Sequence, residues 1–179
     1  MVMTTYGVLS PPVGDRDRAW GRQDAPVTVV LYGDFECPYS GKAFRAVKRL
    51  QGSLPDGFRY VYRHFPIARK HRHAQQAAEA SEAAAAQGRF WEYHDLLYHH
   101  QNELGERDLV RYAADLRLDV GSFEQDLAEH AHAAKVREDS EGGEASGVNG
   151  TPTFFVNGDI FEGFYEYAEL FDVITKEIP

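Results

Sequence analysis

The residue with the clearest capacity for chemistry is Cys37, the one cysteine of this 179-residue chain. It stands in the segment Gly33–Gly41 (GDFECPYSG), where an apolar run gives way to a helical pattern. Pro38 suits the first turn of a helix, because the N–H that it lacks would have no partner there. At a helix N-terminus, unpaired N–H groups and the helix dipole favour a thiolate over a thiol. We interpret Cys37 as a nucleophile; the alternative is a small, buried, unreactive cysteine.

Two strands and a helix are expected to position this cysteine. Val27–Tyr32 (VTVVLY) is nearly all apolar, which is typical of a strand buried on both faces of a sheet. Apolar residues then recur at helical spacing until Gly52 and Pro55 end the helix. Phe58–Arg63 predicts a second strand, and one helix between the two strands indicates a right-handed crossover that pairs them in parallel.

The rest of the chain predicts a helical segment and a return to the sheet. Helical periodicity extends from about residue 72 to 147 and predicts four helices, the last over residues 123–134 with Ser122 as its N-cap. Asn157-Gly158 between two apolar runs predicts a hairpin with a type I′ turn, its strands being 153–156 and 159–163. A final amphipathic helix has an apolar face formed by Tyr167, Leu170, Phe171 and Ile174.

The active-site segment resembles a known motif. Cys37-Pro38-Tyr39-Ser40 is similar to the CxxC motif of thioredoxin-fold disulfide oxidoreductases in its CPYC form, with Ser40 in place of the second cysteine. Three further segments resemble the DsbA-like branch of that superfamily: Asp24–Val27 (DAPV), Arg63–Pro66 (RHFP) and Gly150–Gly158 (GTPTFFVNG). These segments in this order are more specific than any one of them, and the resemblance covers about residues 20–175.

The resemblance and the pattern of elements imply the same architecture. We expect an α/β, thioredoxin-like fold over residues 24–179, with a helical insertion at about residues 67–147. Residues 1–23 are expected to form an N-terminal arm that packs loosely or adds an edge strand, because Ser10–Gly14 (SPPVG) interrupts regular structure.

Thr151-Pro152 is the second feature with a chemical meaning. By resemblance it is the cis-proline loop that faces the active-site cysteine. A cis bond there would let Thr151 offer its backbone N–H and C=O to an extended peptide, whereas the alternative is an ordinary trans proline that opens a strand. The predicted site therefore comprises Cys37 and Ser40 as catalytic positions, Pro38 and Tyr39 as the active-site loop, and Thr151 and Pro152 as substrate-binding residues.

Ser40 determines the expected reaction cycle. A dithiol enzyme resolves its mixed disulfide with the second cysteine, and a hydroxyl group cannot do so. We therefore expect a disulfide oxidoreductase that acts through one cysteine, on protein or small-molecule thiols and disulfides. No bound cofactor is expected, and glutathione or another small thiol is the candidate co-substrate. Ser40 is either natural or a replacement that traps the adduct, and the sequence does not distinguish these.

Two other classes of function are compatible with the sequence. Kappa-type glutathione transferases and hydroxychromene carboxylate isomerases resemble this branch in having a thioredoxin fold with a helical insertion. They carry serine at the first active-site position, where this chain has Cys37, which favours redox chemistry over conjugation. A redox-inactive module that binds peptides through the cis-proline groove is the other alternative.

Composition limits the partners. A net charge of −9 and a pI near 5.3 disfavour nucleic acid and anionic membrane surfaces, since both would repel the chain. No segment approaches the ~20 apolar residues of a membrane span, and residues 1–20 lack the features of a secretory signal. With a single cysteine as well, we expect a cytoplasmic protein; its oligomeric state is not predicted.

Eight histidines raise the question of a metal site. The close pairs His71/His73, His99/His100 and His130/His132 are one or two residues apart, so on a helix the two rings point to different faces. The spacings of known zinc motifs are missing. We therefore predict no metal site and surface histidines on a helical cap. Asp34 and Glu36, which flank Cys37, are equally compatible with a solvated and a catalytic role.

Overall fold

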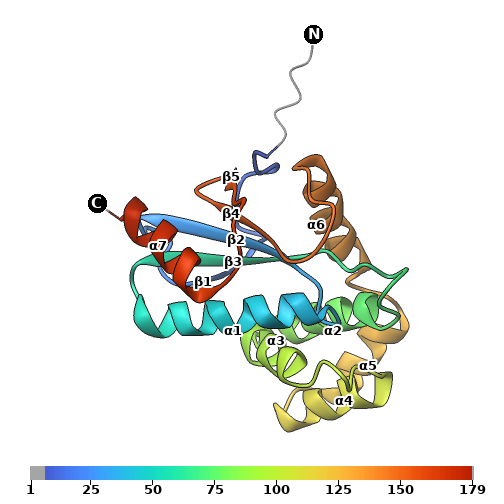
Figure 1. Cartoon of the computed structure of the whole chain (residues 1–179). Coiled ribbons are helices and arrows are strands. Elements are labelled where there is room, and N and C mark those ends of the chain that lie inside the picture. Colours follow the sequence, from blue (N-terminus) through green and yellow to red (C-terminus); the bar gives the residue numbers. More distant parts are fainter. Residues whose placement is uncertain (1–6, 179) are drawn as a thin grey trace.

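A five-stranded mixed sheet forms the centre of the protein (Figure 1) in a computed structural model that describes residues 7–178. Residues 1–6 of the predicted arm lie outside the described residues. The strands are β1 Arg18–Trp20, β2 Val27–Gly33, β3 Phe58–His64, β4 Thr153–Val156 and β5 Asp159–Ile160. The helices are α1 Pro38–Ser53, α2 Ala74–Ala86, α3 Phe90–His99, α4 Glu106–Asp115, α5 Val120–Ala128, α6 Ala133–Ala145 and α7 Tyr167–Glu177.

The strand order is β1-β3-β2-β4-β5. The predicted parallel crossover is confirmed: β2 pairs with β3 from Val27–Phe58 to Gly33–His64, and α1 connects them. The hairpin is also confirmed, with Asn157 at φ 50° and Gly158 at φ 94° in its turn. Its second strand is shorter than predicted, because β5 ends at Ile160. The α/β thioredoxin-like architecture is therefore the one expected.

The two faces of the sheet bury different parts of the chain. Val29, Leu31 and Tyr62 point to the larger core, which also contains apolar residues of α1, α7 and the insertion helices. Val30 and Phe155 point to a smaller core that includes Leu9 and Val148. This alternation follows from the two-residue period of a strand. Because both faces are covered, β2 can be apolar along almost its whole length.

The helical segment differs from the prediction in one place. Five helices lie between residues 74 and 145, because the predicted fourth helix, over residues 123–134, ends at Ala128 as α5 and a further helix, α6, begins at Ala133. His130 lies between them at φ 51°, in the left-handed region, which interrupts a right-handed helix. The predicted cap is also wrong. Asp119 is the N-cap of α5, and its side chain accepts a hydrogen bond from the backbone N–H of Ser122 at 3.1 Å.

The segment predicted as an arm contacts both the sheet and α6. β1 pairs antiparallel with β3 and lies at the edge of the sheet. Leu9 is buried, and the backbone N–H of Ser10 donates to Ser146 Oγ at 2.8 Å. Residues 9–20 therefore help to hold the C-terminal end of α6 against the sheet.

Candidate active site

Cys37 is the N-cap residue of α1, and Pro38 is the first residue of the helix. The Cys37 backbone is extended, at φ −77° and ψ 120°, and the Cys37 N–H donates to the Asp34 carbonyl oxygen at 3.1 Å. Cys37 is 4% exposed, and its thiol donates to the Thr151 carbonyl oxygen at 3.4 Å. The Thr151–Pro152 peptide bond is cis. The structure thus brings the cysteine and the Thr151-Pro152 loop together, although 114 residues separate them.

The other residues of the motif have different environments. Ser40 lies one helical turn after Cys37 and is fully buried; its Oγ accepts a hydrogen bond from the Asp34 N–H at 3.3 Å. Tyr39 is 55% exposed, and the Lys42 ammonium group lies 5.4 Å from the centre of its ring. The loop therefore presents an aromatic side chain to solvent and keeps the serine hydroxyl inside.

A cleft of about 660 Å³ lies beside Cys37. Pro38 and Tyr39 line it on one side, and residues 65–71 form another wall. Ser140 and Glu144 of α6 and residues 148–151 complete the lining. The cleft is large enough for a small thiol or a few residues of an extended peptide, and such clefts are the usual location of binding sites.

Two histidine–carboxylate pairs join the loop 65–73 to the active-site turn. The buried Asp34 carboxylate contacts His71 Nδ1 at 2.8 Å and accepts the backbone N–H groups of Ile67 and Glu36 at 2.9 and 2.8 Å. The Glu36 carboxylate accepts the backbone N–H of His73 at 2.7 Å and contacts His73 Nδ1 at 3.1 Å. Asp34 is thus not solvated, and the sequence did not indicate either pair.

The expectation of surface histidines holds only in part. His99 and His100 are exposed, as predicted. His64 and His94 are buried, and burial lowers the pKa of His94, partly offset by its contact with Asp95. Within residues 7–178, no group of three or more histidine, cysteine or acidic side chains is arranged to hold a metal ion.

Gln101 fixes the backbone around Cys37. Its side-chain Nε2 donates to the carbonyl oxygens of Phe35 and Cys37 at 2.8 and 2.9 Å. Gly41 makes this approach possible, since a Cβ at that position would lie 2.0 Å from Gln101 Oε1. The insertion therefore holds the active-site turn directly, through a residue that sequence reasoning missed because a single glutamine carries no recognisable signal.

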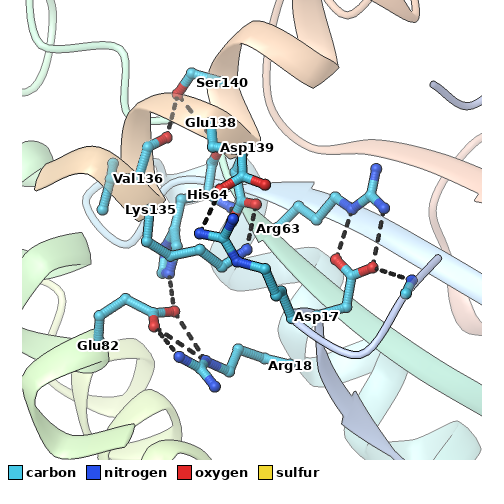
Figure 2. Close-up of polar contacts among 12 residues, drawn as sticks. Asp17, Arg18, Arg63, His64, Glu82, Lys135, Val136, Glu138, Asp139 and Ser140 are labelled. Atoms are coloured by element: carbon cyan, nitrogen blue, oxygen red, sulfur yellow. Dashed lines mark hydrogen bonds and ion pairs between the residues drawn. The ribbon is translucent and has the colours of Figure 1, made fainter. Parts of the chain in front are cut away.

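An ionic network lies next to the segment 65–71 that lines the cleft, and Figure 2 shows its polar contacts. Glu82 of α2 is 1% exposed and binds Arg18 of β1 and His64 Nε2, the latter at 2.9 Å. The backbone N–H of His64 donates to Asp139 of α6 at 3.1 Å. Burial alone would raise the pKa of Glu82, but the hydrogen bonds from His64 and Arg18 lower it to about 2. The network thus ties β1, β3, α2 and α6 together where β3 ends.

Comparison with known structures gives the class of the protein. BdbD from Bacillus subtilis superposes with a TM-score of 0.83 at 24% identity, covering 96% of this chain and 98% of that one. A thioredoxin-like oxidoreductase from Silicibacter pomeroyi superposes with a TM-score of 0.80 at 29% identity, covering 91% of this chain and 92% of that one. α-DsbA1 from Wolbachia pipientis superposes with a TM-score of 0.77 at 20% identity, and the match covers 92% of each chain. The fold is that of the DsbA-like thiol:disulfide oxidoreductases.

The family follows from the sequence match. A family model described as Thioredoxin (Thioredoxin_4) matches residues 14–176. The chain belongs to this family and has Ser40 at the position of the second cysteine of the motif.

The curated relatives are much longer proteins. Na(+)/H(+) antiporter NhaA 1 from Salinispora arenicola is 49% identical over 169 residues, which are 94% of this chain and 26% of the relative. Na(+)/H(+) antiporter NhaA from Herminiimonas arsenicoxydans is 40% identical over 181 residues, 96% of this chain and 29% of the relative. The chain spans less than a third of the length of these relatives. In the part of this chain that the structure describes, no helix has both the length and the apolar character needed to cross a membrane.

Proposed function

We propose that the protein catalyses thiol:disulfide exchange through a single nucleophilic cysteine, Cys37. The observation that carries this proposal is the position of the thiol: it lies at the N-terminus of α1, 3.4 Å from the Thr151 carbonyl oxygen, and borders an open cleft. Helix N-termini favour the thiolate, which is the form that attacks disulfides. Pro38 and Tyr39 shape the approach to the sulfur, and the Thr151 backbone aligns the substrate.

The cycle has two exchange steps. In the first, the Cys37 thiolate attacks one sulfur of a substrate disulfide; a new S–S bond forms, and the other sulfur leaves as a thiolate that takes up a proton. In the second, an external thiol such as glutathione attacks the mixed disulfide and releases Cys37. Ser40 cannot perform this second step, because its hydroxyl is not an adequate nucleophile at neutral pH.

The test is turnover with a small mixed disulfide as substrate. Wild type should reduce the substrate in the presence of glutathione, glutathione reductase and NADPH, and the variant Cys37→Ser should be inactive. Equal rates for the two proteins would reject the proposal. Conjugation of glutathione to an electrophile that persists in Cys37→Ser would instead favour the transferase class.

The relatives suggest a candidate partner. We propose that the protein acts beside a membrane transporter, because relatives at 40% identity or more contain the matching segment within longer chains named as Na(+)/H(+) antiporters. The partner is a protein, so the net negative charge that disfavours an anionic membrane surface does not disfavour this contact. The expected result is a transporter that co-isolates with wild type from native membranes through a reducible bond and is lost with Cys37→Ser. Adducts confined to the soluble fraction would contradict it.

A further inference from the structure

The His71–Asp34 pair lies on the cleft that contains Cys37. His71 Nδ1 is 2.8 Å from Asp34 Oδ2, the Asp34 side chain has no exposed surface, and the His71 side chain is 19% exposed. His71 and Cys37 both line the cleft. Among the described residues, the hydrogen bonds of the His71 ring involve Nδ1 alone. The second ring nitrogen, Nε2, is therefore available to a molecule in the cleft.

We propose that His71 is the general base that activates the external thiol when the mixed disulfide on Cys37 is resolved. This inference rests on the proposed function and adds a residue to it. When Nδ1 donates its proton to Asp34, Nε2 is left as an acceptor, and the carboxylate stabilises the imidazolium that forms. Asp34 acts through His71 and is a positioning residue.

In this step one disulfide bond replaces another, and one proton moves to His71. The proton of the incoming thiol moves to His71 Nε2 while its sulfur attacks the substrate-derived sulfur of the mixed disulfide. The bond between that sulfur and Cys37 Sγ breaks, and its electron pair stays on Cys37 at the N-terminus of α1. The incoming thiol is oxidised to a disulfide, and the Cys37 adduct is reduced. The imidazolium then returns its proton to Cys37 or to solvent.

The absence of a second cysteine is the reason that a base matters here. A thiol with a pKa of ~8.5 is about 3% ionised at about pH 7, so that assistance by a base can raise the rate by roughly 30-fold at most. Other charged groups also face this cleft. They are Arg69 and Lys70 from the loop of His71 and Glu144 from α6; the titratable residues Cys37 and Tyr39 also line the cleft, and the buried Asp34 carboxylate contacts His71 Nδ1.

His73 provides a matched control. It forms the neighbouring pair with Glu36, with a similar contact between Nδ1 and a carboxylate, but the residues that line the cleft include His71 and not His73. Replacing either histidine by asparagine keeps a side-chain nitrogen near the place of Nδ1 and removes the group that titrates. The two variants thus make the same chemical change, inside and outside the cleft.

The experiment measures release of glutathione from a preformed Cys37–glutathione mixed disulfide. Two attacking thiols are compared between about pH 6 and pH 9.5: free glutathione, which is mostly protonated at neutral pH, and cysteine methyl ester, an alkyl thiol that is largely ionised at neutral pH. For His71→Asn we expect a loss of about 10- to 30-fold with glutathione at about pH 7. The loss should disappear near the upper pH limit and be less than about twofold with cysteine methyl ester, while His73→Asn should stay within about twofold of wild type.

Three outcomes would overturn the inference. An equal loss with both thiols would mean that His71 has only a structural role, and His71→Gln, compared by thermal unfolding, would show whether misfolding is the cause. No loss with glutathione would remove the need for a base. If wild type forms no mixed disulfide at all, the proposed function itself fails, so the two failures are distinguishable.

Discussion

Two histidine–carboxylate pairs, whose histidines lie seven residues apart along the chain, have similar contact distances but differ in the access of solvent to the histidine. His71 contacts Asp34 at 2.8 Å on the open cleft, whereas His64 contacts Glu82 at 2.9 Å with both side chains 1% exposed. A pair that a substrate can reach is able to exchange a proton with it. An enclosed pair instead joins the elements around it, and Figure 2 shows Glu82 between Arg18 and His64. By this account, the His71–Asp34 contact takes part in proton transfer in the cleft, and the His64–Glu82 contact stabilises the packing of α2 against β3.

The comparison predicts that the enclosed pair controls stability without affecting the cysteine. Glu82→Gln should lower the free energy of unfolding by about 3–5 kcal/mol, because it leaves the Arg18 charge without its buried partner. The labelling rate of Cys37 by iodoacetamide should be unchanged in the folded variant. Denaturant unfolding and labelling together test this. Glu79→Gln is the control, since Glu79 is equally buried but pairs with the largely exposed His130, and a similar cost there would contradict a special role for Glu82.

The enclosed pair also predicts how stability depends on pH. The pKa of Glu82 is lowered from 4.5 to about 2 in the folded protein, so the unfolded chain binds the proton first as the pH falls. The stability due to this depressed pKa is fully present above about pH 4.5 and is lost as the pH falls toward about 2, a total of about 3 kcal/mol. The difference in unfolding free energy between wild type and Glu82→Gln should shrink over that range. A constant difference would contradict the assigned pKa.

Ser40→Cys, one helical turn from Cys37, should change the reaction and leave stability nearly unaffected, which is the opposite of the effect expected for Glu82→Gln. It should allow an internal disulfide with Cys37 and raise turnover without added glutathione by about tenfold or more. Stability of the reduced protein should change by less than about 1.5 kcal/mol, because the hydrogen bond that Ser40 Oγ accepts from the Asp34 N–H is neutral and long, at 3.3 Å. Intact mass shows whether two hydrogens are lost on oxidation. An unchanged mass together with unchanged turnover would mean that position 40 does not face Cys37.

A smaller effect than that of Glu82→Gln is expected at the contact between the insertion and the active-site turn. Gln101→Ala removes the donor shared by the carbonyl oxygens of Phe35 and Cys37 and should cost about 1–2 kcal/mol. It should also increase the labelling rate of Cys37, since the turn is no longer fixed. Denaturant unfolding and labelling kinetics measure the two effects. Labelling slower than in wild type would contradict the role assigned to Gln101.

The parts of the fold that the sequence predicted rest on local signals. The strand patterns and the Asn157-Gly158 turn are determined by neighbouring residues, and these elements formed as expected. The division between α5 and α6 was missed because His130, a non-glycine residue, adopts the left-handed conformation. Nothing in the surrounding residue types marks it.

The same distinction between local and distant signals applies to the contacts of the candidate site. The segment around Cys37 and the Thr151-Pro152 loop have characteristic residues, and the structure places them in contact. The contact between Asp34 and His71 joins residues 37 apart, and that between Gln101 and Phe35 joins residues 66 apart. Aspartate, histidine and glutamine are common on any surface, so only the folded chain shows which of them meet.

The most direct test of the account is the intact mass of the protein after incubation with oxidised glutathione. Cys37 should gain one glutathione per chain, and the adduct should persist because Ser40 cannot expel it. A dithiol should remove it completely, and Cys37→Ser should gain nothing. A wild-type protein that stays unmodified while its fold is intact would contradict the claim that Cys37 is the nucleophile on which this site depends.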